Sequence, residues 1–310
     1  MTIDAKVLEV YALRPQPPRY ARYFRAIVSF IRYKPMSAFG AFVVILLIVM
    51  AIFPGLFTHQ DPNAINIAER KLGPSGAHLF GTDQLGRDFF SRVVHGARTS
   101  VMIGFGVVFI SAAIASILGV VSGYFGGWFD MLVQRLVDIG IALPGLIFII
   151  LVVTSVQQVP WLGWNIPPLW RIVVSLGFLV SLGSSRVIRG ATIAARQNQY
   201  IEAARVVGAS DGRIILHHML PNVFPVILIG ASIQIGGAIL VEASLSFLGY
   251  GIQPPTASWG RMLNEARDEL VNYPHMAIFP GLAIFLAVFS FNMFGDGLRD
   301  VLDPRLRGSR

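Results

Sequence analysis

Long apolar runs without a charged residue recur along this chain, and they constrain its fold more than any other feature. A helix needs about 20 apolar residues to cross the roughly 30 Å hydrocarbon core of a bilayer. The runs predict six membrane spans, at about residues 36–57, 100–124, 132–157, 168–187, 222–245 and 275–294. Charged residues make up only 14% of the chain, against about 25% in a soluble domain, so a water-soluble globule would expose large apolar patches. We therefore expect an all-α membrane protein.

The distribution of Lys and Arg predicts how the spans are oriented, because cytoplasmic segments carry the excess of basic residues. Basic residues concentrate before the first span, between the fourth and fifth spans and after the sixth, whereas residues 157–170 contain none. Both termini are thus expected in the cytoplasm, with 1–35 as an N-terminal segment, 36–295 as the transmembrane domain and 296–310 as a tail. Residues 20–34 predict a short amphipathic helix lying in the membrane interface.

The chemistry that the sequence lacks narrows the function. The net charge of +8 does not indicate a nucleic-acid partner, since the basic residues stand at the ends of apolar runs, where lipid and topology account for them. The chain has no cysteine, which excludes disulfides, thiolate metal sites and a cysteine nucleophile. It also has no phosphate-binding loop, no HExxH and no GxSxG motif. We expect no catalytic residue, no metal site and no cofactor bound by this chain.

Residues 198–221, between the fourth and fifth spans, are unusual for a plain membrane protein. The sequence predicts two short helices joined by a turn, with Asn198 capping the first and Gly208 ending it in the left-handed conformation. Ala203 and Ala204 leave a small-residue face flanked by larger apolar residues, which fits a groove on another protein. On these physical grounds alone, an ordinary cytoplasmic hairpin with a basic flank is favoured over that docking role.

The pattern Glu202-Ala203-Ala204, followed by Gly208 and by Leu220-Pro221, resembles the EAA loop of ATP-binding cassette (ABC) importer permeases. In that family the loop is a coupling helix that docks on the ATPase subunit. The family pattern is usually written with isoleucine two residues before Leu-Pro, where this chain has His218. The resemblance implies a type I ABC importer permease fold with a cytoplasmic coupling helix. It implies ATPase-coupling roles for Tyr200, Glu202, Ala203, Ala204, Arg205, Gly208, Ala209, Leu220 and Pro221.

Further stretches resemble the C-type permease subunit of dipeptide and oligopeptide importers, the peptide/nickel family. They comprise residues 81–88, 91–92, 96–98, 100, 245–249, 254–255, 258–260, 295–300 and 302–304. The resemblance implies ATP-driven import of di- or oligopeptides across the bacterial plasma (inner) membrane, with ATP and Mg held by partner subunits. The implied partners are a homologous second permease subunit, two ATPase domains or subunits, an extracytoplasmic substrate-binding protein, the peptide and the lipid bilayer.

Alternatives from other classes are weaker on the sequence. An ATP-independent secondary carrier or channel would be favoured by internal repeats of opposite topology, which the hydropathy pattern does not show. An intramembrane enzyme would need polar residues that converge within the bilayer, and only Asp138 and Glu242 are available, in different spans. Within the family, a nickel chelate or a haem-like ligand remains an alternative substrate.

Ionisable residues outside the coupling loop form two groups of candidates. In the predicted extracytoplasmic loop, an acid–base–acid group either docks the binding protein or locks the loop by local salt bridges, and we favour the lock. Within the spans, two residues one helical turn apart predict an ion pair, with a gate or interface role as the alternative, and a third has no evident local partner. The loop group is Asp83, Arg87 and Asp88, and the span residues are Arg135, Asp138 and Glu242.

Overall fold

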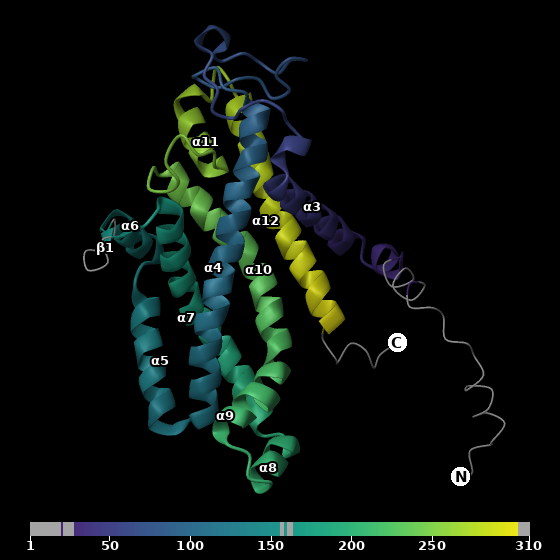
Figure 1. The fold of residues 1–310 in the computed structure, drawn as a ribbon, viewed down its shortest axis with the longest axis vertical. Coiled ribbons are helices and arrows are strands. Elements are labelled where there is room, and N and C mark those ends of the chain that lie inside the picture. Colours follow the sequence, from purple (N-terminus) through teal and green to yellow (C-terminus); the bar gives the residue numbers. More distant parts are fainter. Residues whose placement is uncertain (1–19, 21–27, 156–157, 160–163, 303–310) are drawn as a thin grey trace, which may run out of the picture.

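Long helices running along a common direction make up most of the protein, as Figure 1 shows. This computed structural model describes residues 20, 28–155, 158–159 and 164–302. A loop-rich cap with α11 lies at one end of the bundle, and the short helix α8 lies at the other (Figure 1). The helices are α3 (Pro35–Ile52), α4 (Phe89–Phe125), α5 (Gly127–Ala142), α6 (Gly145–Ser155), α7 (Pro168–Arg196), α8 (Gln199–Val206), α9 (Asp211–Ile214), α10 (Leu220–Phe247), α11 (Trp259–Ala266) and α12 (His275–Leu302).

Shorter elements connect these helices. Two strands of two residues each pair in antiparallel fashion between α6 and α7. A π-helical turn, η3, joins α9 to α10 without a break in the helix. The short elements are η1 (Pro54–Leu56), η2 (Ile67–Glu69), β1 (Gln158–Val159), β2 (Trp164–Asn165), η3 (Ile215–Met219) and η4 (Arg267–Glu269).

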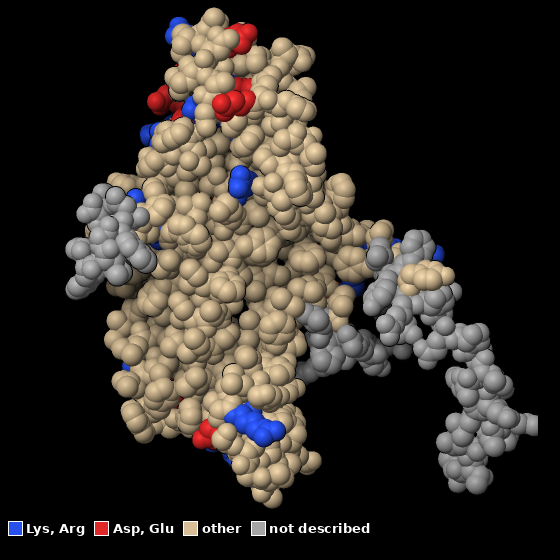
Figure 2. Space-filling view, viewed as in Figure 1, with Lys and Arg blue, Asp and Glu red and all other residues tan. Residues whose placement is uncertain are grey.

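The helices are suited to a bilayer. Within the described residues, five helices are long and apolar enough to cross a membrane, or six if the bent pair α5–α6 counts as one span. Figure 2 shows charged side chains gathered mainly towards the two ends of the molecule, with a broad band between them that carries few. Charged groups are costly in hydrocarbon, so this band is the part that fits within the membrane. The all-α membrane fold expected from the sequence is confirmed.

The third predicted span, residues 132–157, is not one straight helix. The chain bends by 86° between α5 and α6. Leu143 at the bend is extended, with ψ of 132°, because a residue that precedes proline, here Pro144, is disfavoured in the helical conformation. Residues 156–157 lie outside the described part of the chain.

Several helices are longer than the apolar runs from which they were predicted. α4 begins well before residue 100, because the Asp88 carboxylate caps it by accepting a hydrogen bond from the Ser91 amide at 2.7 Å. α12 likewise continues past residue 295, and α7 past residue 187. Hydropathy marks only the apolar part of a helix. Of the predicted amphipathic helix at 20–34, residues 28–33 are helical and most of the remainder lies outside the described residues.

The most extensive helix pairing in the bundle is that of α4 with α7. Glycines permit it: a Cβ on Gly119 would lie 2.6 Å from the Ser185 carbonyl oxygen, and one on Gly123 would lie 2.9 Å from Thr192 Cβ. Small residues at four-residue spacing allow such close approach between membrane helices. The next glycine of that spacing, Gly127, starts α5 with φ of 59° and would meet no atom within 4 Å.

Buried apolar side chains form three clusters. The first joins α3, α4, α10, α11 and α12, and includes Trp259 and Phe291. The second joins α4, α6, α7 and α10. The third lies at the α8 end of the bundle, where Ile201 of α8, Ile214 of α9 and Met219 of η3 are fully buried. This third cluster fixes the position of the loop that carries the predicted coupling helix.

Candidate functional site

The turn that follows α8 has the geometry expected of its glycine. Gly208 has φ of 83°, in the left-handed region that favours glycine. Its amide donates to the Arg205 carbonyl at 2.9 Å, and the Ala209 amide donates to the Ala204 carbonyl at 3.0 Å. This pair of bonds is a Schellman motif, which satisfies the last carbonyls of the helix. The prediction that Gly208 ends the first helix of the loop is confirmed.

One side of α8 is anchored and the other is exposed. Ile201 is fully buried in the third cluster, and Ala204 packs beside it. Tyr200, Glu202, Ala203 and Arg205 are exposed. At the end of the helix, two valines are each 88% exposed, which gives the tip an apolar surface that an isolated soluble end would not favour. The exposed valines are Val206 and Val207.

Two contacts of Tyr124 that the sequence did not reveal connect this loop to the end of α4. Tyr124 Oη donates to Asp211 Oδ1 at 2.6 Å, and the Arg205 guanidinium lies 5.5 Å from the centroid of the Tyr124 ring. Both contacts join residues more than 80 positions apart, which no local pattern predicts. The only sequence signal is a tyrosine at the very end of a long apolar run.

The second helix of the loop differs from the prediction. α9 does not stop before the fifth span but continues through η3 into α10, so that one helical segment runs from Asp211 to Phe247. Pro221 falls in the first turn of α10, and Leu220 is half-buried beside it. Asn198 stands at the N-cap of α8, but its side chain donates to the Ala195 carbonyl instead of capping α8. The turn after α8 therefore leads directly into a helix long enough to span a membrane.

At the opposite end, the acid–base–acid group is buried. Arg87 Nε donates to Asp83 Oδ2 at 2.6 Å, and the Leu85 and Arg87 amides donate to Asp83 Oδ1. Asp88 caps α4 and contacts His78 Nδ1 at 2.9 Å. All three of the predicted residues are less than 9% exposed, so their contacts hold the loop in place. This geometry matches the loop-lock interpretation.

Residues of α11 that the sequence did not single out complete this cluster. Arg87 Nη2 lies 3.1 Å from Glu265 Oε2, and Glu265 Oε1 accepts from Arg261 Nε at 3.2 Å. Arg92, which is only 1% exposed, lies 3.6 Å from Asp83 and 3.7 Å from Glu265. We call these five residues the arginine–acid cluster. Paired charges can remain buried where isolated ones cannot.

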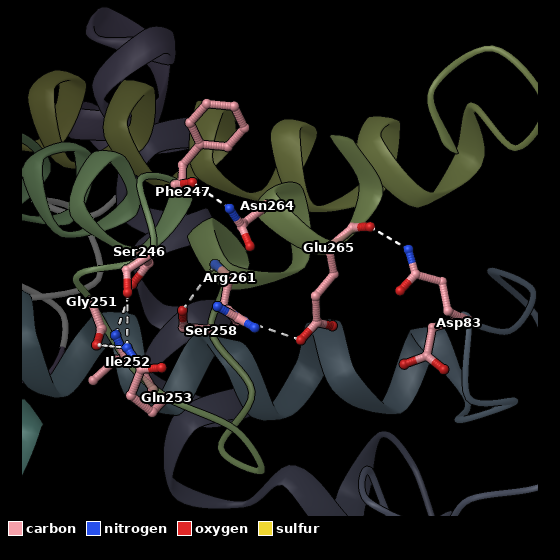
Figure 3. A network of polar contacts seen from close by, with 12 residues as sticks. Asp83, Ser246, Phe247, Gly251, Ile252, Gln253, Ser258, Arg261, Asn264 and Glu265 are labelled. Atoms are coloured by element: carbon pink, nitrogen blue, oxygen red, sulfur yellow. Dashed lines mark hydrogen bonds and ion pairs between the residues drawn. The ribbon is translucent and has the colours of Figure 1, made fainter. Parts of the chain in front are cut away.

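Figure 3 shows how α11 is tied to its surroundings near this cluster. The Gln84 side-chain amide donates to the Glu265 backbone carbonyl. Asn264 Nδ2 donates to the Phe247 carbonyl at the end of α10, at 2.6 Å. Ser258 caps α11 by accepting from the Arg261 amide at 3.3 Å. The loop, α11 and α10 are therefore held together as one unit.

Glu242 has a local partner that the sequence analysis missed. It is fully buried in α10, and Ser246, one turn further along, donates to its Oε1 at 2.7 Å. Ser246 Oγ in turn accepts from the Ile252 amide at 3.1 Å, as Figure 3 shows. A serine at four-residue spacing is the signal that would have identified the pair. The arrangement holds the segment after α10 against that helix.

The predicted ion pair between Arg135 and Asp138 is not formed. Asp138 pairs instead with Arg186 of α7, and both side chains are 46% exposed. A second pair joins the same two helices, with Arg189 Nε and Nη2 bound to the two oxygens of Asp130 at 2.6 and 2.5 Å. The partners come from another helix, because α5 lies against α7 on the side that carries both aspartates. Within the described residues, no group of three or more His, Cys, Asp or Glu side chains is arranged to hold a metal ion.

Comparisons with known proteins agree with this architecture. Residues 115–308 match the family described as "Binding-protein-dependent transport system inner membrane component". The glutathione transport system permease protein GsiD of Escherichia coli O6:K15:H31 (strain 536 / UPEC) is 45% identical over 278 residues, which is 89% of this chain and 89% of that protein. GsiD of Shigella boydii serotype 4 (strain Sb227) has the same identity and coverage.

A solved structure shares the fold. A chain of the MetNI methionine ABC transporter, in an inward-facing conformation, aligns with a TM-score of 0.56 and 19% identity, covering 68% of this chain and 96% of that one. Permeases of this kind are non-catalytic components of the inner membrane, and they act with ATPase and substrate-binding protein partners. The family match and the extent of identity to GsiD confirm the resemblance stated above. This multi-pass membrane chain belongs to the binding-protein-dependent transport system inner membrane components, the permease subunits of type I ABC importers.

Proposed function

We propose that this chain carries di- or oligopeptides as the permease subunit of its importer, and that α8 is the helix through which the ATPase acts. The relatives described above are named for transport of glutathione, which is a tripeptide. The resemblance of residues 81–88 and 245–249 to peptide importers supports the same class of substrate.

The exposed apolar tip of α8 is the observation that carries the coupling role. Val206 and Val207 project from the end of the bundle, while Ile201 is fixed in the core. Because Ile201 holds α8 in the core, a partner that displaces the tip moves the whole helix and does not bend it. Since α9 continues into α10, displacement of the tip rotates or shifts a spanning helix and opens the pathway to one side of the membrane.

The coupling residues divide into three roles. Exposed residues form the docking surface. The turn after α8 sets the angle of its tip, and Leu220 and Pro221 begin the spanning helix that receives the motion. The docking surface comprises Tyr200, Glu202, Ala203, Arg205, Val206 and Val207, with Ala204 packed behind it; the turn is Gly208 and Ala209, and the receiving helix begins at Leu220 and Pro221.

The remaining partners follow from the orientation. The basic loop that carries α8 is assigned to the cytoplasm of a bacterial cell, with both termini, so that the arginine–acid cluster lies outside the plasma membrane. ATP and Mg are bound by the ATPase partners and not by this chain. A homologous second permease completes the pathway, and the binding protein delivers peptide at the α11 end. There, Asp83, Arg87 and Asp88 are buried, which supports a role in shaping the docking loop.

Co-purification tests this function. A tagged copy of the chain is expressed with its neighbouring genes and purified in detergent, and ATP hydrolysis is measured with and without peptides. We expect an ATPase and a second permease to purify with it. Val206→Asp should lose the ATPase and keep the second permease, whereas Val271→Asp, which changes a 93% exposed valine at the other end, should keep both. Retention of a peptide-stimulated ATPase by Val206→Asp would overturn the coupling role of α8.

A further inference from the structure

A proline lies in the interior of the helix that follows the coupling loop. Although Pro221 is in the first turn of α10, η3 runs into that turn without a break. Proline has no amide hydrogen, so Pro221 cannot donate to the His217 carbonyl four residues before it, and its ring crowds that carbonyl. The turn before Pro221 is also wider than an α-helical one, since the Leu220 amide donates to the carbonyl of Ile215, five residues back. The regular hydrogen bonding of the helix is therefore interrupted here.

A second proline extends this interruption along the same side of the helix. Pro225 lies inside α10 and cannot donate to the Pro221 carbonyl. His217, Pro221 and Pro225 follow one another at four-residue spacing, so they lie along one side. That side is open, because His217 and Pro221 are exposed and Pro225 is half-buried. Two successive carbonyls of the open side thus lack the amide donors that hold a helix rigid.

The opposite side of the same turns is tightly packed. Met219 is 0% exposed and Val223 is 1% exposed, and both belong to the third cluster, with residues from the ends of α4 and α7. At about 100° per residue, they lie about 200° from His217 and Pro221, on the other side of the helix. A helix that is fixed along one side and lacks hydrogen bonds along the other can bend about the fixed side.

The prolines also stand near the boundary between two packed units. The start of α10 packs in the third cluster, together with Ile201 of α8, and Ile227 still packs against that cluster. From Ala231 onwards α10 packs against the first cluster, which contains Ile235 and residues of α3 and α12. A displacement of the unit that carries α8 against the rest of the bundle must be accommodated within α10, close to this boundary.

Asn222 bridges the interrupted turn. Its Nδ2 donates to the His218 carbonyl at 2.6 Å, across the turn in which Pro221 supplies no donor. Asn222 is exposed, so this bond is not needed to satisfy a buried side chain. Polar side chains that bond to a carbonyl one turn earlier often bend the helix that carries them. The bond is therefore placed to set the angle between the two parts of the helix.

We propose that residues 217–225 form a hinge that bends when the ATPase moves α8, and that Asn222 is the positioning residue that sets the angle of this hinge. The role rests on the proposed coupling function of α8. Bending at the hinge converts a displacement of the third cluster into a tilt of the outer part of α10. The packing around α8 then stays intact while the spanning part of the helix moves.

The reactivity of a thiol on α10 beyond the hinge reports this movement. The chain has no cysteine, so Gly237→Cys introduces its single thiol, at a site where a Cβ would meet no atom within 4 Å. In proteoliposomes that contain the whole importer, the rate of reaction with a fluorescent maleimide is read on the band of this chain. Rates are compared without nucleotide and after trapping with ATP and vanadate. We expect the two rates to differ by about threefold or more, because the surroundings of the outer part of α10 change when it tilts.

Variants at the hinge should remove this difference while the protein stays folded. Asn222→Asp keeps the shape of the side chain, but a carboxylate cannot donate to the carbonyl, whereas Asn222→Gln keeps the donor and should retain the difference. Pro225→Ala returns the missing amide donor, stiffens the helix and should also remove the difference. Pro168→Ala is the matched control, because Pro168 stands in the first turn of α7, where an amide has no acceptor within the helix.

Two further measurements separate positioning from a structural role. All four variants should keep the thermal unfolding midpoint of the parent and its bound ATPase, which a variant that merely disturbs folding would not. Uptake of radiolabelled glutathione per ATP hydrolysed should fall about tenfold in Asn222→Asp and Pro225→Ala, and remain at the level of the parent in Asn222→Gln and Pro168→Ala.

The outcomes distinguish this proposal from those on which it rests. If Asn222→Asp and Pro225→Ala change their thiol reactivity on trapping as the parent does, the hinge proposal is wrong and the coupling role of α8 stands. If Val206→Asp keeps both the ATPase and the change in reactivity, the coupling role is wrong and the hinge proposal is overturned with it. If the parent takes up no glutathione, yet its thiol responds and the two hinge variants do not, the peptide substrate is wrong and the hinge is supported.

Discussion

The backbone conformation of Gly208 determines how the tip of α8 is presented. With φ of 83°, an L side chain at this position costs about 1–2 kcal/mol, although no atom lies within 4 Å of its Cβ. We predict that Gly208→Asp abolishes uptake while the protein still inserts into the membrane. Gly212→Asp is the matched control, because Gly212 is helical and equally open. Equal uptake by both variants, measured with radiolabelled peptide in cells, would show that the turn is not needed for coupling.

Glu265 holds three arginines in the arginine–acid cluster. Arg87, Arg92 and Arg261 all lie within 4 Å of its carboxylate. Glu265→Gln leaves Asp83 as the single acid of the cluster, so we predict a loss of about 1–3 kcal/mol in stability and a lower thermal unfolding midpoint in detergent. Asp268→Asn, an exposed change two residues into η4, should leave the midpoint unchanged. If Glu265→Gln leaves the thermal unfolding midpoint as unchanged as Asp268→Asn does, the arginine–acid cluster does not lock the loop.

At the scale of single residues, the sequence predicted the roles of residues whose contacts are with near neighbours in the chain. Gly208 was identifiable because a glycine followed a short helical pattern, and the pair of Asp83 and Arg87 because they stand four residues apart. Glu265, Arg186 and Tyr124 were missed, since their partners lie far away in the chain. Long-range pairs depend on which helices pack together, and one sequence carries no direct record of that.

The contact between α4 and α7 depends on glycines that allow no side chain. A Cβ on Gly119 would lie 2.6 Å from a backbone oxygen of α7, which cannot move aside without shifting the helix. We predict that Gly119→Leu costs about 1–3 kcal/mol and lowers both the yield and the thermal midpoint of the purified chain. Gly281→Leu in α12 faces open space and should be tolerated. If both variants are equally stable on size-exclusion chromatography and heating, close packing of α4 on α7 does not limit the stability of the chain.

The spans themselves were predictable because apolar length is a strong constraint in a bilayer. The bend between α5 and α6 was only indicated by Pro144, whose presence predicts a kink but not an angle of 86°. The polar extensions of α4 and α7 were not predicted. They lie where hydropathy falls, and only caps such as Asp88 and packing against neighbouring helices keep these turns helical.

At the scale of the whole molecule, the two ends of the bundle are built for different kinds of contact. The α11 end is a rigid cap, in which loop, helix and span are joined by buried charges and hydrogen bonds (Figure 3). The α8 end presents an apolar tip on a single anchored helix. A rigid cap suits a partner that delivers substrate, and a projecting tip suits one that moves. The bundle between them is long enough for a bilayer to separate the two.

This separation predicts the orientation of the chain, and the absence of native cysteine makes the test direct. Val271→Cys, at a 93% exposed position near the cap, should react with a membrane-impermeant maleimide on intact spheroplasts. Val206→Cys, at an 88% exposed position on the tip of α8, should react only after permeabilisation, and less once the ATPase is bound. The unmodified chain should not react at all, which controls for non-specific labelling. The reverse pattern would place the tip of α8 outside the cell, where no ATP-driven partner could reach it, and would overturn both the orientation and the coupling role.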